Sequence, residues 1–234
     1  MQTSAHPDFA TVPETTLPDG STVPAFQVGR YLCSRSHDGR AQVAADADPW
    51  VRINYRNAVQ ACRDAGFALI TERQALALAW NVAQQPENWT GGKVGEGVLH
   101  MGLHKWNVNS AQPGTYESSD PDERRWFALS NGERVFDVAG NAFTWVHDDV
   151  QGDADGLVAR PFAADSLSLQ GPYPSMKKGM GWRPEVGTDW SGYALIRGGG
   201  WDSGRNAGAF CLNRGWPSDE WSDVGVRCTR PIGA

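Results

Sequence analysis

The sequence predicts an α+β fold, with two helices early in the chain followed by short strands and long loops. Apolar residues recur at helical spacing in two segments, about 55–65 and 72–84. Beyond Asn88, β-rich stretches are brief, and runs rich in Gly, Pro and Ser separate them, the longest at about 152–190. Because the helices come together and no internal repeat follows, a single domain is expected.

Each predicted helix carries start and stop signals. Asn54 can cap the first helix, and Gly66 follows its end. Thr71 can cap the second helix, which must end before Pro86. Strands are expected within 23–35, 194–201 and 224–230, and a hairpin within 124–140 around a type I′ turn at Asn131-Gly132.

The domain is expected to span 21–234, preceded by a loose polar leader over 1–20 that contains three prolines. That leader has neither a basic start nor an apolar centre, so it does not resemble a secretory signal, and a cytoplasmic location is expected. No stretch approaches the roughly 18 apolar residues that a membrane-spanning helix needs.

Charge and cysteine content exclude several classes of function. The chain has 21 basic and 27 acidic residues, a net charge of −6, which disfavours a nucleic-acid partner. Its four cysteines, Cys33, Cys62, Cys211 and Cys228, lie far apart without a C-x-x-C pair, so no metal site or cofactor is predicted. A Cys211–Cys228 disulfide remains open, as does a choice between a solvated loop and a calcium site at the acidic stretch 148–155.

Three segments, 137–145, 196–201 and 224–228, are interpreted as buried scaffold. Gly198, Gly199 and Gly200 allow close approach of another backbone segment. Arg197 and Arg227 lie in apolar strands, so each needs a buried partner, either Asp137 or a cluster of backbone carbonyls.

Taken in order, the segments TERQALALAW, DVAGNAFTW, IRGGGW and VGVRC resemble the formylglycine-generating-enzyme version of the C-type lectin fold, over about 21–230. In those enzymes, the resemblance implies a catalytic cysteine pair just after the Arg-Gly-Gly motif. Here the corresponding stretch, 201–208, contains no cysteine, and Cys228 matches only a scaffold cysteine. Because copper(I) and thiol chemistry need sulfur ligands, no catalytic residue is predicted.

The C-terminal stretch 194–228 more closely resembles the variable region of diversity-generating retroelement proteins, which display varied side chains on the same fold. The matching framework residues are Arg197, Gly198, Gly199, Trp201, Gly204, Ala207, Gly208, Ala209, Phe210, Leu212, Asn213, Pro217, Ser218, Gly225, Arg227 and Cys228. Val226 departs from the framework, where Phe is usual. The resemblance places a variable region at about 197–228 and implies a virion-associated location as an alternative to the cytoplasm.

Between the framework residues lie chemically unrelated, mostly polar positions, which are the predicted ligand-binding residues. They are Gly200, Asp202, Ser203, Arg205, Arg214, Gly215, Trp216, Asp219, Glu220, Trp221 and Asp223. Adenine rewriting of Asn codons, the mechanism of the resembled proteins, yields Gly, Asp, Ser and Arg but not Trp. Trp216 and Trp221 therefore need another template codon or lie outside the varied set.

Two functions follow. The favoured one is a non-enzymatic, hypervariable binding protein whose tryptophans and surrounding charges contact a macromolecular partner, a protein by the resemblance, without a cofactor. The alternative is a copper/thiol oxidoreductase of the formylglycine-generating type that uses a displaced cysteine such as Cys211. A buried Cys211 with no second thiol in disulfide reach would exclude this enzyme.

Overall fold

The computed structural model describes residues 7–232, and within them the two predicted helices form. Helix α1 (Tyr55–Asp64) is capped by Asn54, whose side chain accepts a hydrogen bond from the Asn57 amide at 2.9 Å. Helix α2 (Glu72–Ala83) starts at Thr71, which forms a reciprocal capping box with Gln74. Both predicted caps are confirmed.

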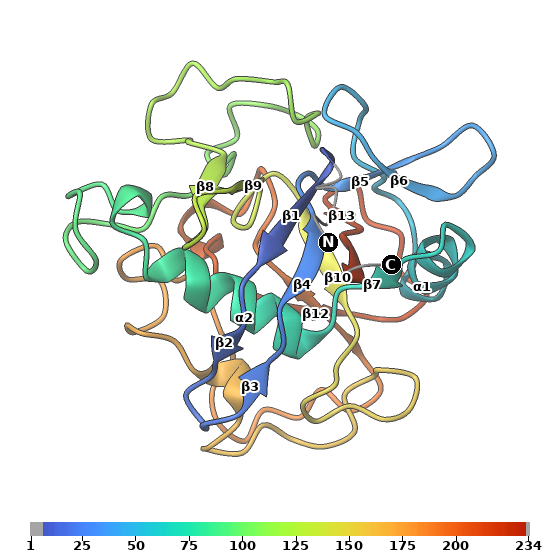
Figure 1. Ribbon diagram of the computed structural model, residues 1–234. Coiled ribbons are helices and arrows are strands. Elements are labelled where there is room, and N and C mark those ends of the chain that lie inside the picture. Colours follow the sequence, from blue (N-terminus) through green and yellow to red (C-terminus); the bar gives the residue numbers. More distant parts are fainter. Residues whose placement is uncertain (1–6, 233–234) are drawn as a thin grey trace.

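One four-stranded sheet joins the two ends of the described chain (Figure 1). Its order is β1 (Phe9–Val12), β4 (Phe26–Gly29), β14 (Cys228–Pro231) and β7 (Ala68–Leu69), with each neighbouring pair antiparallel. Phe9, Ala10 and Val12 are buried, so this part of the expected leader 1–20 is integral to the fold rather than loose. The pairing partner lies 14 or more residues away, which explains why local sequence did not indicate it. Residues 1–6 of the expected leader lie outside the described residues.

The second four-stranded sheet carries the predicted variable region. Its order is β12 (Leu212–Gly215), β11 (Ala194–Arg197), β10 (Phe143–Val146) and β13 (Val224–Gly225). The first three strands are antiparallel, and β13 runs parallel to β10. Two connections therefore leave this sheet, 198–211 between β11 and β12 and 216–223 between β12 and β13.

The remaining strands form small pairs: β2 (Thr15–Thr16) with β3 (Thr22–Val23), β5 (Cys33–Arg35) with β6 (Ala41–Val43), and β8 (Trp126–Ala128) with β9 (Arg134–Phe136). The predicted β8–β9 hairpin is confirmed, but its turn is not type I′. That type needs positive φ at both central residues, and only Gly132 of the Asn131-Gly132 pair has it, at 82°. Short 3₁₀ helices are η1 (Pro86–Asn88), η2 (Leu167–Leu169) and η3 (Gly204–Asn206).

The two buried arginines, Arg197 and Arg227, bind different partners. Arg197 forms a bidentate ion pair with Glu72 of α2, through its Nε at 2.7 Å and its second terminal nitrogen. Arg227 instead donates to the backbone carbonyls of Gly29, Phe136 and Asp137, which is the predicted carbonyl cluster. The Asp137 carboxylate is bound by Arg125, so Asp137 is not the partner of Arg197. The expected alternative, backbone carbonyls, is met in part, because Arg197 also donates to the carbonyls of Ser168 and Phe210.

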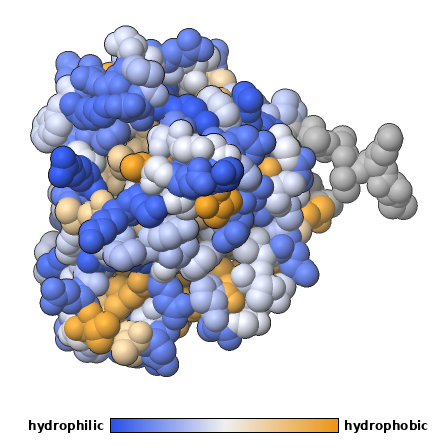
Figure 2. Space-filling view, turned by 90° about the vertical axis from the view of Figure 1, so that its left-hand side faces the viewer, coloured by the Kyte–Doolittle hydropathy of each residue, from blue (hydrophilic) through white to orange (hydrophobic). Residues whose placement is uncertain are grey.

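Packing between α2 and the second sheet fixes the base of the candidate region. Trp80 of α2 meets Phe210 edge-on at 5.4 Å between ring centres, and Leu76 and Leu212 belong to the same buried cluster. Charged and polar residues cover most of the side shown in Figure 2, where apolar surface forms separate patches. None of the described helices is long and apolar enough to cross a membrane.

Candidate functional site

Glycines set the frame from which the predicted binding residues project. Gly198 and Gly199 have positive φ, 97° and 91°, so side chains there would be strained. A Cβ on Gly199 would also lie 2.6 Å from the Cα of Ala207. The Gly198 carbonyl accepts hydrogen bonds from Gly140 and Gly208. This close backbone packing ties the start of the 198–211 connection to the scaffold.

The first surface segment is the turn 200–206. The Gly200 amide donates to Ser203 Oγ at 2.8 Å, and the Gly204 amide donates to the His104 carbonyl at 2.8 Å. These bonds orient η3 so that Arg205 is exposed. Gly200 itself is buried beneath the turn, which corrects the expectation that it contributes surface.

Two carboxylates face each other over Gly200. Asp202 Oδ1 and Asp223 Oδ2 lie 3.0 and 3.2 Å from the position that a Gly200 Cβ would occupy. Burial, and then the charge of Asp202, raise the pKa of the Asp223 carboxyl above its usual value. Both side chains are only half-buried, so they form a negative spot between the two connections.

Aromatic and cationic side chains stack beside the end of β12. Trp216 is 52% exposed, and its ring lies over Tyr193 with the ring centres 3.9 Å apart. The Arg214 guanidinium lies 4.4 Å from the Tyr193 ring centre and 5.1 Å from that of Trp190. These contacts hold Trp216 in place with one part of its ring in solvent.

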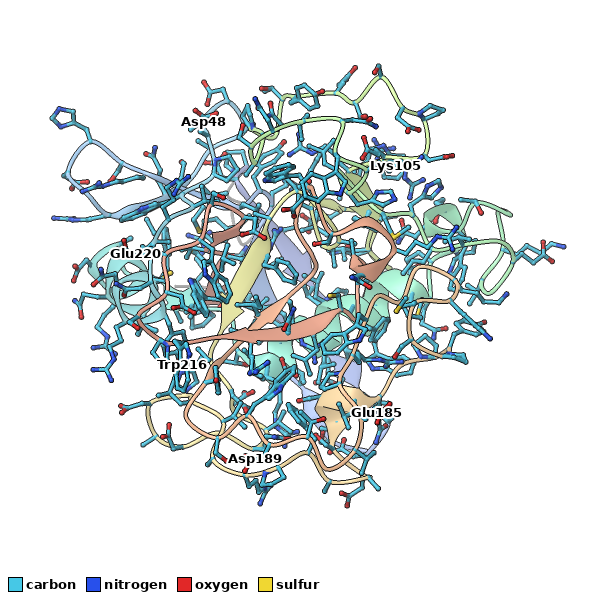
Figure 3. All side chains as sticks on the ribbon, turned by 180° about the vertical axis from the view of Figure 1, so that it is seen from behind. Asp48, Lys105, Glu185, Asp189, Trp216 and Glu220 are labelled. Carbon is cyan, nitrogen blue, oxygen red and sulfur yellow. The ribbon has the colours of Figure 1, made fainter. Side chains whose placement is uncertain are left out.

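The second surface segment is the turn 216–223. Asp219 closes it, because its amide donates to the Trp216 carbonyl and its Oδ2 accepts from the Trp216 amide at 2.8 Å. Glu220 accepts a hydrogen bond from the Asn54 side chain at 3.0 Å. In Figure 3, Glu220 lies beside α1 and Trp216 lies below it, toward the loop that carries Asp189.

Trp221 is 40% exposed and is partly seated on the scaffold. It stacks on the buried Trp145 with ring centres 6.4 Å apart. Gly215 makes room for this stack, because a Cβ there would lie 2.6 Å from Trp145 and 3.0 Å from Trp221. Gly215 is buried, so the expectation that it projects from the surface is also corrected.

The structure thus divides the eleven predicted residues into three groups. Arg205, Trp216, Glu220 and Trp221 are exposed; Asp202, Ser203, Arg214, Asp219 and Asp223 are half-buried; Gly200 and Gly215 are buried. We call the nine residues of the first two groups the candidate face.

Sequence reasoning missed several neighbours that come from outside 197–228. Tyr193 and Asn54 contact the candidate face as described above, and the Arg52 amide donates to the Trp221 carbonyl. Trp106 is 65% exposed, and its ring meets Trp201 edge-on at 5.4 Å. Nothing in the sequence indicated that Trp106 lies beside Trp201, because this contact joins segments about 95 residues apart.

All four cysteines are free and buried. Cys211 is 1% exposed, and burial raises the pKa of its thiol to about 12. The Sγ atoms of Cys62 and Cys228 lie 3.4 Å apart, and Cys33 also contacts Cys228. No contact in the described structure brings another sulfur to Cys211. The Cys211–Cys228 disulfide, which the sequence left undecided, is therefore absent from the structure.

The acidic stretch 148–155 is not uniformly solvated. Asp148 is buried, and its Oδ1 accepts from the amides of Val150 and Gln151 at 3.0 Å each. Asp153 Oδ1 accepts from the amides of Asp155 and Leu157. Among residues 7–232, no group of three or more His, Cys, Asp or Glu side chains is placed to hold a metal ion.

No protein-family model matches the sequence, and no curated protein matches it. Solved structures do match. PvdO from Pseudomonas aeruginosa is 14% identical, with 96% of this chain and 92% of PvdO covered and a TM-score of 0.48. The Major Tropism Determinant M1 variant is 16% identical, with a TM-score of 0.47; the match covers 96% of this chain and 55% of that one, so this chain spans about half its length. Treponema denticola variable protein 1 is 13% identical, with 95% and 94% covered and a TM-score of 0.45.

The similar structures therefore include variable proteins of diversity-generating retroelements, together with PvdO and CarF from the formylglycine-generating-enzyme side of the C-type lectin fold.

Proposed function

We propose that this chain is a hypervariable ligand-binding protein, which displays the candidate face on a C-type lectin scaffold to bind a macromolecular partner, a protein. The observation that carries the proposal is the contrast between the buried glycines and aromatic rings of the scaffold and the varied side chains of the candidate face. Buried glycines and stacked rings fix the two connections and the end of β12, whereas nine unrelated, mostly polar side chains are exposed or half-buried there. The proposed location is the cytoplasm or a virion surface.

The composition of the candidate face supports a protein partner. Trp216 and Trp221 offer large, partly ordered apolar surfaces that lose little entropy on binding, and Arg205 and Glu220 add charge at the rim. Tyr193, whose ring stacks on Trp216, adds to the same surface a residue from outside the variable region.

The oxidoreductase alternative is disfavoured by the thiols. A nucleophilic or copper-binding cysteine needs an accessible thiolate, and burial of Cys211 opposes both access and ionisation. All four cysteines belong to one buried cluster, in which the Sγ atoms of Cys62 and Cys228 lie 3.4 Å apart.

The test is genetic. A near-copy of the DNA that encodes 197–228, differing only at adenines and lying beside a reverse transcriptase gene, is expected in the source genome. Sister copies of the gene should then differ at positions of the candidate face, while Gly199, Gly208 and Gly215 stay constant. The segment encoding 124–140 of the same gene serves as the control and should not vary. Differences spread evenly over both segments would contradict the proposal.

A further inference from the structure

A cavity of about 500 Å³ lies beside α2, away from the candidate face. Pro18, Trp80 of α2, Arg183 and the segment 169–174 line it, and none of the nine residues of the candidate face does. In Figure 3, Glu185, which follows Arg183 closely in the chain, lies on the opposite side of the molecule from Glu220 of the candidate face. The cavity is therefore separate from the surface of the proposed function.

Most of the cavity wall is apolar and held in place. Trp80 is half-buried against the core cluster. Tyr173 meets the buried Trp89 edge-on, with ring centres 5.4 Å apart, and the proline rings of Pro172 and Pro174 restrict the backbone on either side of it. A preformed wall of this composition suits the apolar part of a small molecule.

Arg183 supplies the charge on this wall. Among the described residues that line the cavity, it alone is ionised at neutral pH. Its Nε donates to Ser175 Oγ at 3.1 Å and its Nη2 to the Tyr173 carbonyl at 3.0 Å, whereas its Nη1 is buried without a partner. Within residues 7–232, Arg183 forms no ion pair.

The surroundings of Arg183 leave its charge without a counter-charge. Burial, and then the positive charge of Arg197, lower the pKa of Arg183 to about 10, so the guanidinium is still charged at pH 7. Arg197 is itself paired with Glu72. Because a half-buried charge without an opposite charge nearby is unfavourable, a ligand with one negative charge would stabilise this arrangement.

Gly171 keeps space open beside the unpartnered nitrogen. A Cβ at this position would lie 2.4 Å from Arg183 Nη1. Gly171 is not among the glycines with positive φ, so the local backbone does not require a glycine there. The requirement comes instead from the close approach of the guanidinium to the segment that lines the cavity.

We propose that this cavity binds a small aromatic carboxylic acid, whose carboxylate accepts hydrogen bonds from Arg183 and whose ring packs on Trp80 and Tyr173. A planar carboxylate matches the geometry of guanidinium donors, and its single charge offsets the single charge of Arg183. A doubly charged phosphate would leave excess negative charge against an otherwise apolar wall.

Calorimetric titration of the full chain with 3-phenylpropionate at pH 7 tests the proposal. Saturable binding at one site is expected, with a dissociation constant of about 1 mM or below. Acetate, which lacks the ring, and 3-phenylpropionamide, which lacks the charge, should each bind at least about tenfold more weakly. No saturable binding of 3-phenylpropionate, or equal affinity for either analogue, would overturn the proposal.

Three variants locate the binding site. Arg183→Gln removes the charge, and Gly171→Ala keeps the charge but displaces the guanidinium, so each should weaken 3-phenylpropionate binding at least about tenfold. Arg160→Gln, which removes an exposed arginine outside the cavity, is the matched control and should leave binding unchanged. The melting temperature of each variant shows whether it is folded. Unchanged binding in a folded Arg183→Gln or Gly171→Ala variant, or an equal loss in Arg160→Gln, would overturn the proposal.

Discussion

Single residues decide how the candidate face is supported, and Gly215 is the sharpest case. It lies in β12, where the missing side chain leaves the space in which Trp145 and Trp221 stack. Gly215 was predicted to be a ligand-binding position because it lies between framework residues of the resembled family. The structure places it in the frame, since its contacts are with a buried ring from β10.

Gly215→Ala should destabilise the protein by about 1–3 kcal/mol, because the added methyl group would overlap the Trp145 ring and force the stack apart. Thermal unfolding measures the change. Ser218→Ala, at an exposed position of the neighbouring turn, is the matched control and should leave the melting temperature nearly unchanged. Equal melting temperatures for both variants would show that the stack tolerates a side chain at 215.

Asp148 gives a pH-dependent prediction. Burial, followed by the charge of Glu72, raises the pKa of this carboxyl from 3.8 to about 6, and its Oδ2 is buried without a partner. The folded state therefore holds the proton more tightly than the unfolded state. This group destabilises the fold above pH 6, and the destabilisation disappears as the pH falls from 6 toward 4.

Asp148→Asn keeps the Oδ1 acceptor used by Val150 and Gln151 and removes the charge. The variant should be more stable than the parent at pH 7 by about 1–3 kcal/mol and equally stable near pH 4. Denaturant unfolding across this pH range checks the prediction. A stability difference that does not change with pH would contradict it.

Predictions about single residues succeeded where the residues that decide the environment are adjacent in the sequence. Glu220, Ser222 and Asp223 flank Trp221, and these polar neighbours correctly indicated that Trp221 is exposed. It failed where a partner comes from a distant segment. Glu72 carries no sequence signal that it binds Arg197, because the two residues are 125 positions apart. Tyr193, under Trp216, was missed for the same reason.

At the scale of elements, the Glu72–Arg197 pair joins α2 to β11 in the interior. Glu72→Gln would leave a buried guanidinium without its counter-charge, so we expect a loss of about 3–5 kcal/mol. Glu133→Gln is the matched control, because the Arg30–Glu133 pair is partly exposed and should contribute below about 1 kcal/mol. Denaturant titration compares the two variants, and similar losses would show that the interior pair contributes no more than a surface one.

Helices were predictable because their signals are contiguous. Asn54 and Thr71 mark their starts by residue type alone, and both bond as predicted. The strand β1 was not predictable, because Phe9–Val12 is short and its stability depends on pairing with β4. The run 23–35, expected to be one strand or a bent arm, is divided among β3, β4 and β5, with Gly29 at the end of β4.

At the scale of the whole molecule, burial of every cysteine predicts a chemically inert native state. A thiol-specific disulfide reagent should modify none of the four within minutes in the folded protein and all four after unfolding in guanidinium. Cys62 and Cys228 should resist modification together, since their sulfur atoms are in contact in the same buried cluster. A single fast-reacting thiol in the folded protein would restore the oxidoreductase alternative.

If the segment before β14 is rewritten, as the proposed function requires, the placement of β14 between β4 and β7 has a consequence for the gene. Synthesis reaches Cys228–Pro231 only after the predicted variable region has been translated, yet this strand completes the sheet that β1 and β4 begin. A copy with a premature stop or a shifted frame upstream would lack the central strand and leave the edges of β4 and β7 open. Faulty copies would therefore be cleared as unfolded chains, and only products read correctly to this strand would reach a partner.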